Sequence, residues 1–221
     1  KTKQKKQMSK FKIKLTTPKD IVYPINYEPN KKSKDTKKFK NIIAVIPARG
    51  NSKRLKDKNI FKVWNKPMIY WTIKAAKNSK FIKEIYVSSE SKKILSVSKK
   101  FKVKTIERPE ILSNDKVFKM DVVTHATKYI ERKFSKPDII VSIQAKSPEI
   151  SSNDIDGAIN HMIKYKRNEV ISVDKNGNQN AAIRVMLYDT VFQRTLSTKV
   201  GFYKTNITDI HTIEDIKKLS I

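Results

Sequence analysis

The sequence predicts an α/β fold with a mainly parallel sheet that is covered by helices on both faces. From Asn41 onward, short apolar runs rich in β-branched residues alternate with segments whose apolar residues recur at helical spacing. Short polar segments with turn and cap signals separate these elements. Such alternation is typical of βαβ units, whose strands are buried on both faces and therefore appear as continuous apolar runs.

Each element follows from its own pattern. The predicted strands are residues 41–47, 84–89, 102–107, 138–144, 170–174 and 181–189. The predicted helices are residues 66–79, 91–101, 121–134, 151–166 and 212–221. The polar segment 175–180 indicates a hairpin or loop, and residues 189–210 fit either a short helix or a strand.

Helix ends carry further signals. Pro67 falls near the first turn of the first helix, where proline is tolerated. Ser152 or Asn153 is the expected cap of the helix at 151–166, and Thr212 with Asp215 forms a capping-box pattern. One face of the helix at 121–134 is expected to be buried; it consists of Met120, Val123, Ala126, Thr127 and Ile130.

Composition narrows the class of protein. The 221 residues are 38% apolar, enough for one globular domain with an extension. No apolar run approaches the roughly 20 residues of a membrane span, and we expect a soluble, cytoplasmic protein. The absence of cysteine excludes disulfides, thiolate metal sites and a cysteine nucleophile. The three histidines are too scattered for a zinc site.

Residues 1–40 are predicted to be a basic, flexible arm preceding a domain at 41–221. The arm holds 14 Lys and three acidic residues with little periodicity. Contact with nucleic acid, contact with an anionic membrane, and solubility alone all remain open for it. The scarcity of Arg argues against specific base recognition, and the body does not interleave aromatics with Arg, so nucleic-acid binding is the least favoured class.

The stretch "IPARGNSKRLKDKN", residues 46–59, is a candidate anion site. Five of its fourteen residues are Lys or Arg, and Gly50, Asn51 and Ser52 offer backbone N–H groups and small side chains after a buried strand. It matches neither the Walker loop nor the G-x-G-x-x-G fingerprint. The segments 88–91 and 144–149 also follow strands, where ligands of parallel sheets bind. The alternative is a solvated loop in a lysine-rich chain.

Several separated motifs together resemble the acylneuraminate cytidylyltransferase family. They are "AVIPARGNSKRLKDKNI", "KPMIYWTIKAAKNS", "IYVSSES", "ERPEILSND", "SIQAKSPEI" and "TDIHTIEDI", in this order. The resemblance implies a Rossmann-like nucleotidyltransferase that transfers CMP from CTP to a 2-keto sugar acid and releases pyrophosphate with Mg²⁺. Catalysis would then consist chiefly of positioning and charge neutralisation.

The resemblance also assigns site residues. The implied nucleotide-binding residues are Ala48, Arg49, Gly50, Asn51, Ser52, Lys53, Lys58, Asn59 and Arg108. The implied catalytic residues are Arg49, Lys58, Asp209 and His211, and Gln144 is expected at the sugar acid. Simpler roles stay open for three of the matched residues: Arg108 as the end of a strand, Gln144 as a partner of local backbone, and Asp115, which matches an Asp of the family, as a helix cap.

The chain departs from the family pattern in ways that bear on activity. Asp209 is the expected Mg²⁺ ligand, but His211 stands where relatives carry a second Asp, and imidazole is a poor ligand for this ion. His211 can instead act as a general base or have no chemical role. Lys146 replaces a usual Thr and adds charge beside an anionic substrate.

The region between "VISVD" and "TDIHT" is shorter than in typical relatives, so the sugar acid and a homodimer both remain open. The runner-up is a non-catalytic relative that keeps the fold and binds nucleotide or a partner. A carboxylate supplied elsewhere, such as Glu90 or Asp174, would favour the enzyme.

Overall fold

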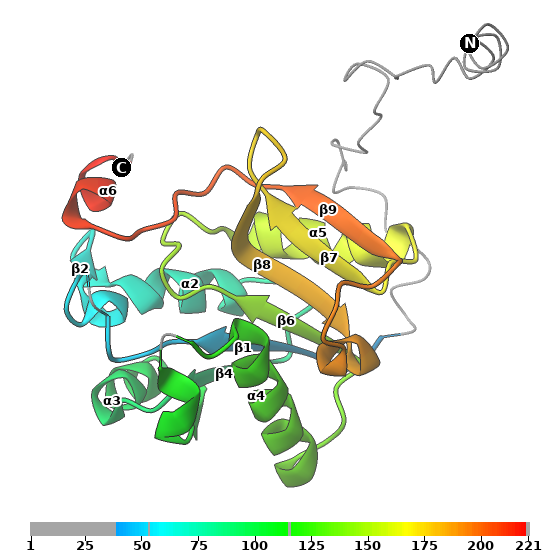
Figure 1. Ribbon diagram of the computed structural model, residues 1–221, viewed down its shortest axis with the longest axis horizontal. Helices are drawn as coiled ribbons and strands as arrows, with labels where there is room; N and C mark the ends of the chain where they lie inside the picture. The colour runs from blue at the N-terminus through cyan, green and yellow to red at the C-terminus, as the bar shows by residue number, and fades with distance from the viewer. Residues whose placement is uncertain (1–38, 53, 115, 220–221) are drawn as a thin grey trace, which may run out of the picture.

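The computed structural model describes residues 39–52, 54–114 and 116–219 (Figure 1). The predicted N-terminal arm lies outside these residues apart from Phe39 and Lys40, and so do Lys53 and Asp115. Within this part of the chain, no helix combines the length and the apolar character needed to cross a bilayer.

A seven-stranded sheet forms the centre of the molecule, in the order β5-β4-β1-β6-β8-β7-β9. Four strands on one side run parallel: β5 (Lys104–Glu107), β4 (Glu84–Ser89), β1 (Ile42–Pro47) and β6 (Ile139–Ile143). The other side contains β8 (Gln179–Leu187), β7 (Glu169–Val173) and β9 (Val200–Lys204). β8 pairs antiparallel with both β6 and β7, whereas β9 pairs parallel with β7. The predicted mainly parallel sheet is confirmed, and β8 is its one reversed strand among the described strands.

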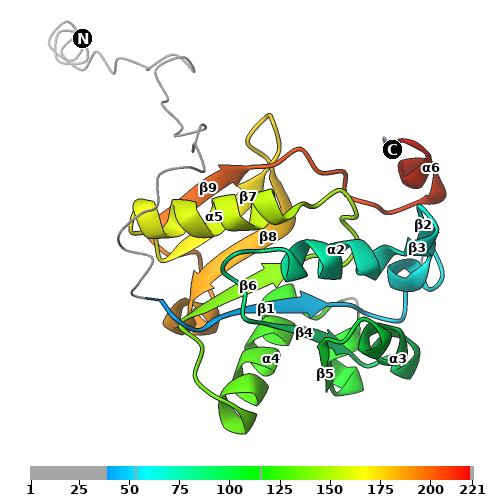
Figure 2. The ribbon, with the colours of Figure 1, turned by 180° about the vertical axis from the view of Figure 1, so that it is seen from behind.

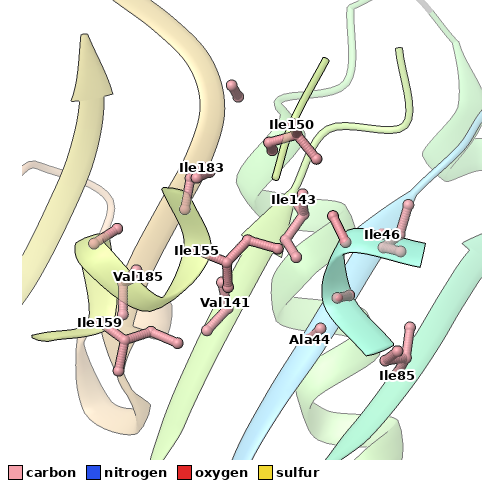
Figure 3. Packing of buried hydrophobic residues seen from close by; sticks show 14 of the residues in the cluster. Ala44, Ile46, Ile85, Val141, Ile143, Ile150, Ile155, Ile159, Ile183 and Val185 are labelled. Atoms are coloured by element: carbon pink, nitrogen blue, oxygen red, sulfur yellow. The ribbon is translucent and has the colours of Figure 1, made fainter. Parts of the chain in front are cut away.

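Helices cover both faces of this sheet (Figure 2). One face carries α2 (Met68–Lys77), α3 (Lys92–Lys100) and α5 (Ser152–Lys164), and the opposite face carries α4 (Lys119–Lys133). β1 shows the reason, because Ile42, Ala44 and Ile46 pack into one apolar cluster and its intervening residues pack into the other. Figure 3 shows the first cluster, where Ile155 and Ile159 of α5 lie over the sheet. The face predicted for α4 is buried throughout.

The predicted elements differ from the structure mainly at their ends. The expectation that Ser152 or Asn153 caps α5 is wrong, because Ser151 accepts from Asp154 N and completes a capping box with that residue. The capping box of Thr212 and Asp215 is confirmed, but its helix, α6 (Ile213–Lys217), is short. Residues 174–178 form the predicted hairpin turn between β7 and β8.

Short elements complete the fold. They are η3 (Lys58–Ile60), β2 (Lys62–Val63), β3 (Lys66–Pro67), η4 (Glu110–Ser113) and η5 (Tyr188–Phe192). The ambiguous stretch 189–210 contains the end of η5 and then β9. The segment after β9 returns across the molecule, and α6 lies beside the β2–β3 hairpin (Figure 1). Ile210 and Leu219 are buried there against Val63 and Met68, which fixes the return segment.

Candidate nucleotide site

A cavity of about 570 Å³ lies where the carboxyl ends of the parallel strands meet. The loop after β1, the segment between β5 and α4, the loop after β6 and the return segment contribute to it. Its lining includes Arg49, Ser52, Arg54, Lys58, Asn59, Arg108, Lys119, Gln144, Lys146, Asp209 and His211. Two of the strand-end segments singled out in the sequence, 46–59 and 144–149, line this cavity. The third, 88–91, supports the loop after β1 through Glu90.

The loop after β1 is held by hydrogen bonds to its neighbours. The Ala48 N–H donates to the Ser88 carbonyl at 2.9 Å, and the Gly50 N–H donates to Glu90 Oε1 at 2.7 Å. Asn59 is buried and donates through Nδ2 to the Arg49 carbonyl at 2.8 Å. Asn59 therefore shapes the loop from within, and the Gly50 N–H is already committed to a carboxylate.

Gly50 is required by close packing. A Cβ atom at this position would lie 2.7 Å from the Cβ of Ser91 and 3.4 Å from Glu90 Oε1. The first distance is shorter than side chains tolerate, so any larger residue would displace the loop. The loop and the start of α3 are thereby fitted to each other.

Ser52 is a lining residue of the cavity with a buried hydroxyl. Its Oγ atom is buried and has no hydrogen-bond partner among the residues that the structure describes. Buried polar atoms normally find partners, and those that lack one within the protein commonly meet a ligand or water. A phosphate oxygen is a suitable acceptor for this group.

Arg108 is buried at the cavity wall and held in a fixed orientation. Its Nη2 donates to Glu90 Oε2 at 2.8 Å, its Nη1 to the Ser88 carbonyl at 3.2 Å, and its Nε to Ser113 Oγ at 3.3 Å. Burial alone would raise the pKa of Glu90, but backbone N–H groups, including that of Gly50, and the Arg108 charge hold it below its usual value. Because a guanidinium has five N–H donors, donors remain for a ligand.

Asp209 is the centre of a polar cluster on the other side of the cavity. Its Oδ1 accepts from Gln144 Nε2 at 2.8 Å and forms an ion pair with the Lys146 ammonium. Its Oδ2 lies 2.8 Å from His211 Nε2, and Lys146 Nζ lies 3.1 Å from the same ring nitrogen. Both carboxylate oxygens of Asp209 therefore already have protein partners.

Basic residues dominate the electrostatics of the cavity. Six Arg or Lys side chains line it, and Asp209 is the single carboxylate among its described lining residues. Burial lowers the pKa of Lys58 to about 8, and the Lys146 charge adds to this effect. Burial likewise lowers the pKa of Lys119 to about 8 and lowers the pKa of Lys146. This surface is suited to a polyanion.

The return segment is attached directly to the strand-end loops. The Lys58 ammonium donates to the Ile210 carbonyl at 3.2 Å, and the Thr208 N–H donates to Glu149 Oε2 at 2.7 Å. These contacts bring residues more than 50 positions apart in the sequence to one side of the cavity. Asp209 and His211 owe their positions to them.

The structure brings most of the predicted site residues together. Arg49, Ser52, Lys58, Asn59, Arg108, Gln144, Asp209 and His211 all line the cavity. Ala48, Gly50 and Asn51 belong to the same loop but do not line it, and Lys53 lies outside the described residues. Their contacts with nucleotide stay predictions.

Two lining cations, Arg54 and Lys119, were missed by sequence reasoning. Lys119 is the first residue of α4, where a positive charge is unfavourable for the helix dipole. This unfavourable position was the sequence signal that could have identified Lys119 as a site residue. Of the alternative carboxylates, Glu90 is occupied by Arg108 and Gly50. Asp174 instead accepts from Asn176 and Asn178 in its own exposed turn.

The residues at Asp209 do not fit a magnesium ion in this arrangement. Mg²⁺ prefers octahedral oxygen ligands, commonly one or two carboxylates with waters and phosphate oxygens. Asp209 offers one carboxylate whose two oxygens are occupied by Gln144, Lys146 and His211. In the described part of the chain, no cluster of three or more His, Asp or Glu side chains is arranged for a metal.

A cationic cavity at the carboxyl ends of a mainly parallel sheet defines an α/β nucleotide-binding class of protein. The chain matches the cytidylyltransferase family model over residues 43–215 and belongs to that family. It is 28% identical over 144 residues to an N-acylneuraminate cytidylyltransferase of Escherichia coli, covering 65% of this chain and 33% of that protein. A CMP-N,N'-diacetyllegionaminic acid synthase of Campylobacter jejuni is 35% identical over 109 residues, covering 48% of this chain and 46% of the synthase.

Solved structures agree on the fold. A CMP:2-keto-3-deoxy-manno-octonic acid synthetase complexed with CTP has a TM-score of 0.66 at 16% identity, covering 80% of this chain and 96% of that one. The predicted Rossmann-like nucleotidyltransferase fold is therefore confirmed. The matched stretch spans about a third and about half, respectively, of the two curated relatives named above.

Proposed function

We propose that the chain is a CTP-dependent cytidylyltransferase that transfers CMP to a 2-keto sugar acid and releases pyrophosphate. The observation that carries this proposal is the cationic cavity, built by the loop after β1 in a chain of the cytidylyltransferase family. A nucleoside triphosphate has about four negative charges, which six lining cations can balance. In such a site catalysis is positioning and charge neutralisation in an in-line displacement.

The loop after β1 would bind the triphosphate. Arg49 and Lys58 would neutralise the charge that develops on the leaving pyrophosphate, and Ser52 Oγ would donate to one of its oxygens. Because Lys58 also donates to the Ile210 carbonyl, its ammonium is positioned before the nucleotide arrives. Preorganised cations of this kind lower a barrier without reorganisation during the reaction.

Arg108 would recognise the base. Its three hydrogen bonds to Ser88, Glu90 and Ser113 fix the plane of the guanidinium at the cavity wall. A fixed planar donor suits the carbonyl edge of cytosine. Selectivity for CTP would then depend on the rigidity of this Arg as well as on its charge.

Gln144 and His211 would act on the acceptor. Asp209 can hold His211 in the tautomer with the proton on Nε2, which leaves the Nδ1 lone pair to accept the proton of the attacking hydroxyl. Gln144 donates to Asp209 through Nε2, so its amide oxygen can face a hydroxyl of the sugar acid. The names of the two curated relatives refer to N-acylneuraminate and to N,N'-diacetyllegionaminic acid, which supports an acceptor of this class.

The test is pyrophosphate release from CTP with a panel of eight-carbon and nine-carbon 2-keto sugar acids. At least one acceptor should release pyrophosphate and yield one CMP-sugar per pyrophosphate, with UTP as the nucleotide control. His211→Asn should lower this rate by about 10²-fold, as loss of a general base does. If CTP binds but no acceptor releases pyrophosphate above the rate with CTP alone, the chain is a non-catalytic relative.

A further inference from the structure

Lys146 and His211 touch each other at Asp209. Lys146 lies in the loop after β6, and His211 lies 65 residues later, in the return segment. Lys146 Nζ lies 3.1 Å from His211 Nε2, and both side chains contact Asp209. An ammonium and an imidazole therefore occupy the carboxylate that was expected to hold the metal ion.

We propose that the Lys146 ammonium takes the place of a divalent cation at Asp209, so that nucleotide binding requires no metal at this carboxylate. The proposal rests on the cytidylyltransferase function proposed above. The ligand of the Lys146 ammonium would be the triphosphate of the nucleotide, whose charge this side chain would neutralise directly.

The position of Lys146 fits this role. The residue lies in the loop after β6 and lines the cavity together with Arg49 and Lys58. The positive charges of Arg49 and Arg54 act on it, and the Lys146 charge in turn acts on Lys58, so these cations converge on one part of the cavity. The backbone strengthens the arrangement, because the Lys146 carbonyl accepts from the Ile210 N–H at 3.4 Å.

Charge balance at Asp209 leads to the same conclusion. One carboxylate is matched by one ammonium. A divalent ion at Asp209 would have to displace Lys146 or share the carboxylate with it, and the two cations would repel each other. Asp215 cannot help as a second carboxylate, because its Oδ2 accepts from the backbone N–H groups of His211 and Thr212.

Metal binding without nucleotide provides the first test, and it does not depend on the proposed function. Mn²⁺ alone would be titrated into the protein and followed by its electron paramagnetic resonance signal. We expect that Asp209→Asn removes no Mn²⁺ site from the wild-type protein, because Asp209 binds no metal there. The double variant with Lys146→Thr and His211→Asp should bind Mn²⁺ at least tenfold more tightly than the wild type. A tight wild-type site that is lost in Asp209→Asn would overturn the proposal, and so would a double variant that gains none.

Nucleotide binding provides the second test. CTP would be titrated calorimetrically in EDTA and again in MgCl₂, and we expect wild-type Kd values within about threefold of each other. In EDTA, Lys146→Met should weaken binding at least tenfold and Lys146→Arg less than threefold. Lys99→Met, on the exposed side of α3 and outside the cavity lining, controls for the loss of one charge.

The outcomes separate the two proposals. If EDTA weakens wild-type CTP binding tenfold or more, or if Lys146→Met binds like Lys99→Met, Lys146 does not replace the metal. If CTP, UTP and ATP bind alike in both conditions, the proposed function fails instead, and the Mn²⁺ titration still decides the role of Lys146.

Discussion

The two sides of the sheet contribute to the cavity in different ways. On the side of β5, β4, β1 and β6, short segments at strand ends supply the cations, and the strands pair in parallel. On the other side, β8 reverses direction, and a segment that follows β9 returns to supply Asp209 and His211. The first side therefore depends on local sequence, whereas the second depends on contacts between distant residues.

This difference suggests which properties the two sides determine. The parallel side carries the loop and the Arg that we propose as the triphosphate and base sites. The return segment carries Asp209 and His211, which contact Lys146 of the loop after β6. We expect changes on the parallel side to affect nucleotide binding most, and changes at the return segment to affect metal use and the acceptor.

The largest effect is expected for Lys58→Met. Lys58 also bonds to the return segment, through the Ile210 carbonyl. Removal of a preorganised charge at the leaving group costs about 10²–10³-fold in rate. Pyrophosphate release would measure this loss, with Lys62→Met, an exposed neighbour, as the matched control. A rate within threefold of the control would show that Lys58 has no catalytic role.

Gly50→Ala should affect both stability and nucleotide affinity. The added Cβ would lie 2.7 Å from Ser91 Cβ, so the loop or the start of α3 must move. Overpacking of this kind costs about 1–3 kcal/mol in the free energy of unfolding. Urea unfolding and CTP titration would measure the two effects. Gly177→Ala, in the β7–β8 turn, places a Cβ that meets nothing within 4 Å but at a φ of 85°, so it should lower stability and leave CTP affinity unchanged. Equal loss of CTP affinity in both variants would contradict the role given to the loop.

Acid should destabilise the β9 side through His161. Burial lowers the pKa of this ring from 6.5 to about 4, so the unfolded chain binds the proton more tightly. Stability from this residue is present above pH 6.5 and is lost as the pH falls from 6.5 toward 4. The free energy of unfolding of the wild type should fall between pH 7 and pH 5. In His161→Leu this fall should be smaller by about 1–2 kcal/mol, allowing for solvent screening. Urea unfolding at the two pH values measures this, and an unchanged difference would contradict the assignment.

The smallest effect is expected in the pH dependence of nucleotide binding. Lys58 and Lys119 have pKa values lowered to about 8, so both lose positive charge as the pH rises through 8. The affinity for CTP should therefore fall severalfold between pH 7 and pH 9. Calorimetry of the wild type and of Lys119→Arg would measure it, and the variant should show a shallower decline because Arg stays charged. A wild-type affinity that rises over this range would contradict the proposed role of these cations.

The same division determines how much could be predicted from the sequence. β1 and α4 follow from local apolar patterns, and the sequence places both within a few residues. The antiparallel insertion of β8 depends on pairing with β6, from which it is separated by α5 and β7, so no local pattern reveals it. Residues in short polar segments, such as the Ser151 cap, are predicted only to within a residue or two.

The site divides in the same way. The sequence predicts Arg49 and Lys58 because they share one loop with Gly50 and Ser52. The contact between Lys146 and His211 joins positions 65 residues apart and appears only after folding. Arg108 was predicted, but its partner Glu90 was considered only as a metal carboxylate.

The proposed function requires that the cavity binds CTP in preference to other nucleotides. Calorimetric titration of CTP, UTP and ATP into the wild type and into Arg108→Met tests it most directly, with circular dichroism to confirm that the variant is folded. We expect CTP to bind at least tenfold more tightly than UTP or ATP, and we expect Arg108→Met to lose this preference. Equal binding of the three nucleotides, or no binding by the folded wild type, would contradict it.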